Sequence, residues 1–415
     1  MRRIAIVGGG QAGMPLALGL LDKGYEVTVA TNRTPDDVKN GRVMSSQCMF
    51  DISLQFERDL GINFWEDKCP PVEGIGFTVP HPEKPGEKAI TWRSRLDNYA
   101  QAVDQRIKMP YWMELFAARG GDLRIEDVGV AELERLAETH DLVILAGGKG
   151  EIVKLLERDP SRSPYDKPQR ALALTYVHGM LPTPEYSQVS FNLIPGVGEY
   201  FVFPSLTNSG DCHIMVFEGV PGGPMDQWGE ARTPQEHLAY SKKIIETYLP
   251  WEAERCKHVE LTDENGILAG RFAPTVRKPV LTLPSGKIVF GLGDALVTND
   301  PLTGQGSNNA TKACKVYYDA ILAHGDKPYT AQWMNETFEQ FWKYGRHVVE
   351  WTNALLAPPE PHVLNVLGAA QQLPALAHTV ANAFNYPPVL APWWHDAHAC
   401  DTYIQSLMQE EVRAS

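Results

Sequence analysis

The sequence lacks the usual marks of a secreted, membrane-spanning or nucleic-acid-binding protein. No stretch approaches the roughly 18 consecutive apolar residues that a transmembrane helix requires. Met1, Arg2 and Arg3 lead directly into a short apolar run, without the features of a signal peptide, so we expect a cytoplasmic protein with no membrane partner. A formal net charge of -13 without a cluster of Lys and Arg argues against nucleic acid as a partner.

Disulfide and metal motifs are missing as well. The six cysteines are scattered without CxxC spacing, so we expect them to be packing residues and not disulfides or zinc ligands. The spacings His395/His398 and His347/Glu350 could each supply two metal ligands. Because neither pair has a third candidate ligand, we expect no metal site.

The first 30 residues have the pattern of a strand, a helix and a second strand. Residues 4–7 are an apolar run, apolar residues recur at helical spacing over 14–21, and Gly24 is a suitable C-cap. The next β-rich stretch covers 26–30. This order predicts the opening βαβ unit of a dinucleotide-binding fold.

Gly8, Gly10 and Gly13 form a GxGxxG motif between this strand and this helix. In such a motif the glycines allow a tight turn, a close approach of pyrophosphate to the backbone, and close helix packing. The phosphates then lie at the helix N-terminus, here Gln11 and Ala12, where free N–H groups favour negative charge. The motif does not distinguish NAD from FAD, and a glycine-rich turn without a ligand is the alternative.

The acidic residue that would hold a ribose about 20 residues further on is missing. The second strand ends instead in Thr31, Asn32 and Arg33. Thr31 and Asn32 could still hydrogen bond an adenosine ribose, and Arg33 could lie near its phosphates. We therefore keep a dinucleotide site at this position.

Two later segments could complete the same sheet. Residues 141–146 are a continuous apolar run, as in a parallel strand buried on both faces, and 287–290 form another strand before a glycine-rich stretch and a helix. Between them, residues 170–285 alternate β-rich stretches with turn residues, which predicts an inserted antiparallel sheet. Beyond about residue 330 the pattern becomes helical and is interrupted by prolines.

A second glycine motif, Gly291-Leu292-Gly293-Asp294, follows the 287–290 strand. The loop 300–309 comes next, and its glycines could bring backbone N–H groups close to a ligand at the start of a helix. The alternative for Asp294 is a helix cap. The loop residues that we expect to bind a cofactor are Pro301, Gly304, Gln305, Gly306, Ser307 and Asn308.

Over nearly its whole length the chain resembles the oxygenase component of the styrene and indole monooxygenase family. Besides the glycine motifs, the resemblance rests on Ala118-Arg119-Gly120-Gly121, the string Ser163-Pro164-Tyr165-Asp166-Lys167-Pro168-Gln169-Arg170-Ala171-Leu172, Trp351-Thr352-Asn353 and Phe384-Asn385-Tyr386-Pro387. It implies FAD as the cofactor, with the Asp294 carboxylate accepting a ribityl hydroxyl. It also implies FAD contacts from Arg42, Arg106 and Val128, and catalytic positions beside the flavin at Ser45, Ser46 and Pro301. Thr303 departs from the apolar residue that the resemblance leads us to expect.

The resemblance implies a two-component enzyme that takes reduced FAD from a separate NAD(P)H:flavin reductase. Single-component relatives carry an Asp-Gly pair where this chain reads Ala146-Gly147-Gly148-Lys149-Gly150, and no second GxGxxG motif is present. Reduced flavin and O2 would form a C4a-peroxyflavin that epoxidises an alkene, so no general base is needed. The family also suggests a homodimer. A flavin-dependent halogenase and a non-catalytic FAD-binding protein are the rivals.

The expected substrate is a small aromatic alkene, with indole preferred. The styrene-preferring branch tends to carry Asn, Val and His where this chain has Ser45, Gln47 and Met49, and Ser45, Ser46 and Gln47 could accept the indole N–H. Styrene epoxidation is the alternative, and Gln47 could instead point to solvent or cap a turn. Further substrate-binding positions are Val72, Ile75 and Ala100.

The expected fold is therefore α/β, with an FAD-binding Rossmann-like domain of the aromatic-hydroxylase type. This domain is discontinuous and comprises residues 1–169 and 286–330. Residues 170–285 would form the inserted antiparallel substrate domain, and 331–415 a helical C-terminal region.

Overall fold

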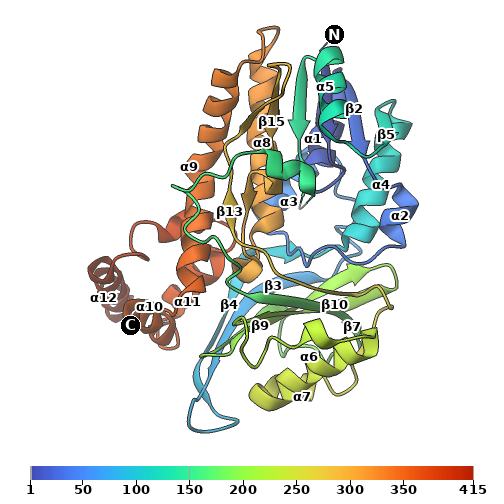
Figure 1. Ribbon diagram of the computed structural model, residues 1–415. Helices are drawn as coiled ribbons and strands as arrows, with labels where there is room; N and C mark the ends of the chain where they lie inside the picture. Colours follow the sequence, from blue (N-terminus) through green and yellow to red (C-terminus); the bar gives the residue numbers. More distant parts are fainter. Residues whose placement is uncertain (1, 149, 415) are drawn as a thin grey trace.

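The first sheet carries the glycine motifs. It has the strand order β14-β15-β6-β1-β2-β5 in this computed structural model, which describes residues 2–148 and 150–414 (Figure 1). Its neighbouring strands are parallel, except that β14 is antiparallel to β15. The strands are β1 (Arg3–Val7), β2 (Glu26–Thr31), β5 (Asp122–Ile125), β6 (Leu142–Leu145), β14 (Val280–Thr282) and β15 (Ile288–Gly291).

Helices pack on this sheet because its strands are apolar on both faces. α1 (Gly13–Asp22) links β1 to β2 and ends before Gly24, whose φ of 84° suits the left-handed turn there. α8 (Gly306–His324) follows the second glycine motif and packs against α1. The other helices of this lobe are α2 (Pro35–Lys39), α3 (Asp51–Asp59), α4 (Gln105–Ala118), α5 (Val130–Thr139) and the 3-10 turns η1 (Glu151–Leu155), η3 (Gly293–Ala295) and η4 (Pro301–Thr303).

The second sheet lies below the first lobe in Figure 1. Its strand order is β11-β7-β10-β9-β8-β3-β4, with β12 pairing beside β7. α6 (Pro234–Tyr248) and α7 (Pro250–Arg255) cover its outer face through a buried apolar cluster. The strands are β3 (Pro71–Pro80), β4 (Lys88–Gln101), β7 (Ala171–His178), β8 (Gln188–Ile194), β9 (Gly198–Thr207), β10 (Gly210–Gly219), β11 (Glu260–Leu261) and β12 (Ile267–Gly270); β13 (Thr275–Val276) pairs separately with β16 (Val297–Thr298), and η2 (Trp228–Glu230) is a 3-10 turn.

The fold class is confirmed, but the composition of the second sheet differs from our expectation. β3 and β4 come from the segment that we assigned to the first lobe, and β3 pairs with β8 in parallel, so the sheet is mixed. β14, which lies within 170–285, joins the first sheet instead. β4 is an edge strand, and most of its residues are exposed or only partly buried, so its sequence gives only a weak apolar signal. The division into three domains stays a prediction.

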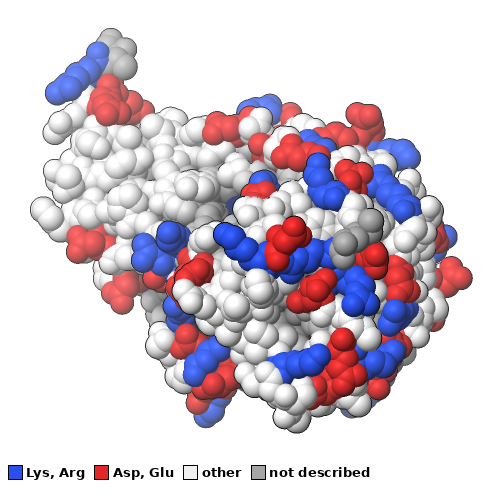
Figure 2. Space-filling view, turned by 90° about the horizontal axis from the view of Figure 1, so that it is seen from above, with Lys and Arg blue, Asp and Glu red and all other residues white. Residues whose placement is uncertain are grey.

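The C-terminal helices lie beside the second sheet, except for the first of them, which packs against α8 of the first lobe. They are α9 (Ala331–Leu356), α10 (Pro361–Ala369), α11 (Pro374–Asn382) and α12 (Ala397–Ala414), with the 3-10 turn η5 (Pro387–Leu390). Between Arg346 and Arg413 the chain carries no Lys or Arg, and Figure 2 shows few charged side chains at the upper left, where the last helices lie. None of the helices in the described part of the chain is both long and apolar enough to cross a bilayer.

The inner face of the second sheet supports the region of greatest interest. Its buried side chains join those of residues 43–50 in one apolar cluster, which we call the inner cluster. The inner cluster includes Val43, Cys48, Phe50, Val72, Ile75, Ala100, Leu174, Tyr176, Phe201, Phe203 and Ile214. It places the substrate positions expected from the sequence between the two lobes.

Candidate flavin site

The two glycine motifs, about 280 residues apart in the sequence, meet in the structure. Gly293 has a φ of 64°, and a Cβ built on it would lie 2.9 Å from the Cβ of Ala12. A side chain at position 293 would therefore be strained and would collide with the start of α1. The fold brings Asp294 to the same end of the sheet as the GxGxxG turn.

The GxGxxG turn has the shape of a phosphate cradle. A Cβ on Gly8 would lie 2.6 Å from the Ala146 oxygen, and one on Gly13 would lie 2.0 Å from the Gly8 oxygen. Gly10 is different, because a Cβ there would meet no described atom within 4 Å. The backbone is thus packed on the inside and open at Gly10, as a close pyrophosphate requires. These residues fit a dinucleotide cofactor.

Thr31 lies beside this turn, and a carboxylate that we had not singled out lies next to it. The Thr31 Oγ1 would be 3.5 Å from a Cβ on Gly9, whereas Asn32 and Arg33 are exposed. Glu126, directly after β5, donates its backbone N–H to the Thr31 oxygen at 2.9 Å. Its carboxylate pairs with Arg135 at 2.7 Å. β2 itself ends without an acidic residue, but the carboxylate of Glu126 lies beside that end of the strand. Only the pairing of β2 with β5 reveals this.

Asn308 joins residues 300–309, hereafter the flavin loop, to the segment 42–50. Its Oδ1 accepts the Phe50 N–H at 2.8 Å, and its Nδ2 donates to the Cys48 oxygen at 2.8 Å and the Gly304 oxygen at 3.0 Å. The side chain is fully buried. One amide therefore holds together the two segments that we expected on either side of the flavin edge.

Other motifs of the resemblance also meet the flavin loop. The Thr303 and Thr352 hydroxyls lie 2.6 Å apart, so the unexpected Thr303 has a polar partner. Gln305 donates to the Phe384 oxygen at 2.8 Å. Asp300 accepts the Leu302 N–H at 3.2 Å and caps the turn that contains Pro301. These contacts fix the loop backbone, while Gly304 and Gly306 have no described atom within 4 Å of a built Cβ.

Ser45 and Gln47 form a hydrogen-bonded pair at the edge of the inner cluster. The Ser45 hydroxyl donates to Gln47 Oε1 at 2.7 Å, and the Tyr176 hydroxyl donates to the Ser45 carbonyl at 2.8 Å. Gln47 is buried, so it does not point to solvent, and no acceptor among the described residues reaches its Nε2. Met49 is buried and exchanges backbone hydrogen bonds with Gln101, while Ser46 is half-buried.

The three apolar residues that we predicted to bind substrate lie in one cluster. Val72 and Ile75 from β3 and Ala100 from β4 all lie in the inner cluster and are buried. Ala100 stands opposite Val72 in the register of the two strands. They form an apolar wall beside the segment that carries Ser45 and Gln47.

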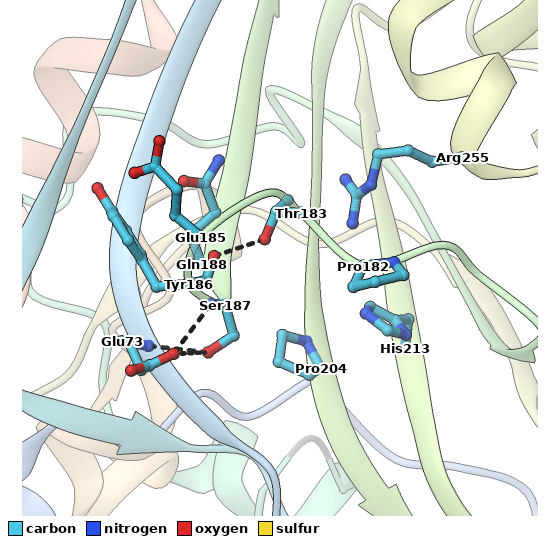
Figure 3. A pocket seen from close by; sticks show the side chains of 10 residues that line it. All are labelled: Glu73, Pro182, Thr183, Glu185, Tyr186, Ser187, Gln188, Pro204, His213 and Arg255. Atoms are coloured by element: carbon cyan, nitrogen blue, oxygen red, sulfur yellow. Dashed lines mark hydrogen bonds between the residues drawn. The ribbon is translucent and has the colours of Figure 1, made fainter.

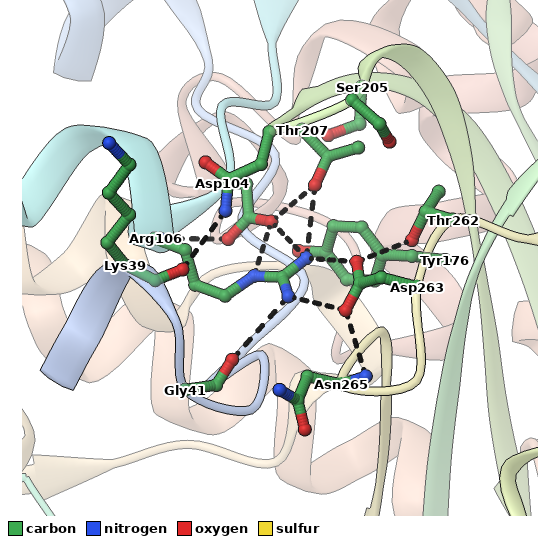
Figure 4. Close-up of polar contacts among 12 residues, drawn as sticks. Lys39, Gly41, Asp104, Arg106, Tyr176, Ser205, Thr207, Thr262, Asp263 and Asn265 are labelled. Carbon is green, nitrogen blue, oxygen red and sulfur yellow. Dashed lines mark hydrogen bonds and ion pairs between the residues drawn. The ribbon is translucent and has the colours of Figure 1, made fainter. Parts of the chain in front are cut away.

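Arg106, a predicted FAD contact, has partners within the protein. All five of its N–H groups are engaged: Nε with Asp104, and the two terminal nitrogens with the Gly41 oxygen, Thr207 and both carboxylate oxygens of Asp263 (Figure 4). No N–H remains for a phosphate, so the structure favours a positioning role for Arg106 behind the Gly41 turn. This turn leads into Arg42, which is exposed and available, while Val128 is buried in the core of the first lobe.

Comparisons with known proteins show the family of this chain. The chain is 31% identical to styrene monooxygenase StyA of Pseudomonas fluorescens over 397 residues, which covers 93% of each chain. The chain belongs to the styrene monooxygenase family. Residues 148–255 match the family model described as the styrene monooxygenase A substrate binding domain, and residues 3–44 match the model of the coenzyme F420-dependent NADP oxidoreductases.

Solved structures of other flavoproteins share the fold of this chain. The flavoprotein/dehydrogenase from Cytophaga hutchinsonii superposes with a TM-score of 0.69 at 14% identity and covers 99% of this chain and 100% of its own. The flavin-dependent brominase Bmp2 superposes with a TM-score of 0.67 at 13% identity over 99% of both chains. At such low identity these two structures show the fold alone.

This styrene monooxygenase family member is a flavin-dependent monooxygenase, and its cofactor is FAD. Bound FAD in its reduced form supplies the electrons for O2. The open backbone at Gly10, Gly304 and Gly306 is where this chain can hold it. Within the described residues, Ala146, Gly147 and Gly148 contribute no carboxylate beside Gly8; Lys149 lies outside the described residues.

Arg277 is a further residue that the sequence did not suggest. Its guanidinium lies close enough to Asp294 for the carboxylate charge to act on it, and it donates to the Ala295 oxygen at 3.3 Å. Arg277 precedes β14, about 17 residues before Asp294, and carries no recognisable motif. It can hold the η3 turn in place while Asp294 serves the cofactor.

A surface hollow of about 360 Å³ lies elsewhere, on the second sheet (Figure 3). None of the site residues expected from the sequence lines it, and its polar lining includes Glu73, Ser187 and Arg255. No group of three His, Cys, Asp or Glu side chains in the described part of the chain could hold a metal ion. All six cysteines are free and buried, which confirms them as packing residues.

Proposed function

We propose that this chain is the oxygenase component of a two-component monooxygenase that epoxidises indole in preference to styrene. Reduced FAD would come from a separate NAD(P)H:flavin reductase. The epoxide would rearrange to indoxyl, which dimerises in air to indigo. Styrene monooxygenase relatives support the reaction type, and the absence of a second GxGxxG motif from the sequence supports the need for a reductase.

The hydrogen bond between Ser45 and Gln47 carries the substrate proposal. The Gln47 Oε1 already accepts the Ser45 O–H. The acceptor for a substrate N–H is therefore the hydroxyl oxygen of Ser45, which Gln47 orients. This refines the expectation that all three polar residues of the segment act alike. Indole has one N–H donor that must be satisfied when buried, whereas styrene has none. Bound styrene would leave the Ser45 hydroxyl oxygen without a donor from substrate or water.

The surroundings of this pair favour a flat aromatic substrate. Val72, Ile75 and Ala100 offer only apolar surface, and Ala100, opposite Val72, has the smallest side chain of the three. The unpartnered Gln47 Nε2 is then left to an acceptor on the cofactor or on oxygen. We therefore assign orientation of the substrate to Ser45, and orientation of Ser45 to Gln47. Ser46 and Pro301 are proposed to border the reacting edge of the flavin.

A competition assay tests this proposal. The purified chain, a flavin reductase, NADH and FAD are mixed with indole and styrene together, and both products are quantified. We expect kcat/KM to favour indole about 5- to 150-fold, the cost of one unpaired buried acceptor. Gln47→Val should narrow this ratio, while Gln332→Val on the exposed face of α9 should leave it unchanged. Equal or better use of styrene by the unmodified chain would refute the indole assignment.

Styrene epoxidation is the second candidate, because both curated relatives are named styrene monooxygenases. The apolar wall of Val72 and Ile75 would accept a vinyl group equally well. The competition assay decides between the two substrates. A homodimer is also proposed, and light scattering of the purified chain would test it.

A further inference from the structure

Three buried carboxyl groups gather where the second sheet meets the flavin loop. Glu199 and Glu218 stand opposite each other on β9 and β10, and Asp300 begins the flavin loop. Their exposed fractions are 3%, 0% and 0%. Carboxyl groups at this depth must be paired with a cation or hold a proton.

Arg170 is the cation of this cluster, and it is committed to Glu199. Its Nε and one terminal nitrogen donate to the two Glu199 oxygens at 2.7 and 2.9 Å, while its other terminal nitrogen donates to the Gln169 and Leu356 carbonyls. This bidentate pair balances the charge of Glu199. Arg170 ends the Lys-Pro-Gln-Arg string of the resemblance, so the string has a structural task here.

Glu218 lies beside Asp300, and no donor among the described residues satisfies its carboxyl group. No N–H or O–H group of the described residues reaches either Glu218 oxygen, and the Asp300 carboxyl lies close enough for the two groups to interact. A hydrogen bond between two carboxyl groups requires a proton on one of them. Burial, together with the charge of Asp300, raises the pKa of Glu218 well above its usual range. Geometry and charge therefore point the same way.

We propose that Glu218 and Asp300 share one proton at neutral pH, and that this carboxyl pair fixes the start of the flavin loop on β10. Asp300 also caps the turn containing Pro301, so a shift of its carboxyl moves that turn. Loss of the proton would set two buried carboxylates against each other and push the loop from the sheet. The inference rests on the proposed role of the flavin loop in holding FAD. Glu218 is thus a positioning residue.

The first test needs no cofactor. Glu218 protonated in the folded state releases its proton on unfolding, so its stabilisation is complete below the ordinary range of Glu and is lost as pH rises. In Glu218→Gln, the amide N–H can donate to the Asp300 carboxylate at any pH, so no titratable proton is needed. We expect the Tm of the unmodified chain to fall with rising pH relative to Glu218→Gln, and the infrared band of a protonated carboxyl to be lost in the variant. Glu157→Gln, at an exposed ion pair, is the control.

The second test uses FAD. Above the pH where the pair ionises, the Kd of the unmodified chain for FAD should rise by up to about tenfold per pH unit, while Glu218→Gln should keep its affinity. Asp300→Asn should likewise abolish the pH dependence and serves if Glu218→Gln does not fold. Parallel Tm curves and an unchanged infrared band would overturn the shared proton. A lost band with FAD affinity that does not follow pH would overturn the positioning role. A chain that binds no FAD at any pH would instead contradict the proposed function.

Discussion

Replacement of Asn308 by alanine tests whether the flavin loop depends on the segment 42–50. The wild-type side chain makes three buried hydrogen bonds, with the Phe50 N–H and with the Cys48 and Gly304 oxygens. Alanine removes the side-chain partner of all three backbone groups at once, at a position that is fully buried. At about 0.5 to 1.5 kcal/mol for each bond, the free energy of unfolding should fall by about 1.5 to 4.5 kcal/mol.

The functional consequence should exceed the loss of stability. Without Asn308, the loop that borders the flavin and the segment carrying Ser45 and Gln47 are no longer joined directly. The loop can then move away and give water access to the reacting edge. Reduced flavin would then reduce O2 to hydrogen peroxide instead of oxygenating the substrate. We expect product formed per NADH consumed to fall at least threefold, with peroxide rising in proportion.

The measurements are urea unfolding of the chain and a paired assay of product and peroxide with a flavin reductase. Asn335→Ala is the control, since Asn335 is exposed on α9 and its side chain donates to the Ala331 oxygen one turn earlier. It should change stability by less than about 0.5 kcal/mol. An Asn308→Ala protein with the stability and coupling of the unmodified chain would refute the reasoning, because the three bonds would then be dispensable.

Three further predictions follow from the same site. Asp294→Ala should weaken binding of reduced FAD at least tenfold, the worth of charge-assisted hydrogen bonds of about 1.5 to 3 kcal/mol, and calorimetry showing equal affinity would remove Asp294 from the site. The purified chain with FAD and indole should consume negligible NADH or NADPH until a reductase is added; rapid consumption by the chain alone would contradict a two-component enzyme. Burial lowers the pKa of Lys312 to about 7 from an ordinary value near 10.5, although its Nζ donates to the Asn385 oxygen at 2.9 Å. The unfolded chain binds a proton there that the folded chain does not, so stability relative to Lys312→Met should rise between about pH 7 and 10.5, and parallel Tm curves would count against a buried neutral lysine.

The sequence by itself determined the fold class and the position of the phosphate cradle. The glycines at 8, 10 and 13 and the apolar strand before them are local signals, since tight turns and buried parallel strands leave their mark on adjacent residues. The strands around 171, 189, 200 and 213 were equally legible for the same reason. The family resemblance added the identity of the cofactor, FAD, and the prediction that residues 300–309 contact it.

Only the tertiary structure decided which distant residues act together. β4 is a largely exposed strand at a sheet edge, so the pattern of residues 88–101 does not indicate that it belongs to the second sheet. Arg106 was expected at FAD, but Asp263, 157 positions away, occupies its guanidinium. The carboxyl pair of Glu218 and Asp300 is likewise invisible in the sequence, because β10 and the flavin loop are separated by some 80 residues. Local sequence sets turns and strands through short-range sterics, whereas hydrogen bonds and buried charges depend on through-space distances that only the packed fold fixes.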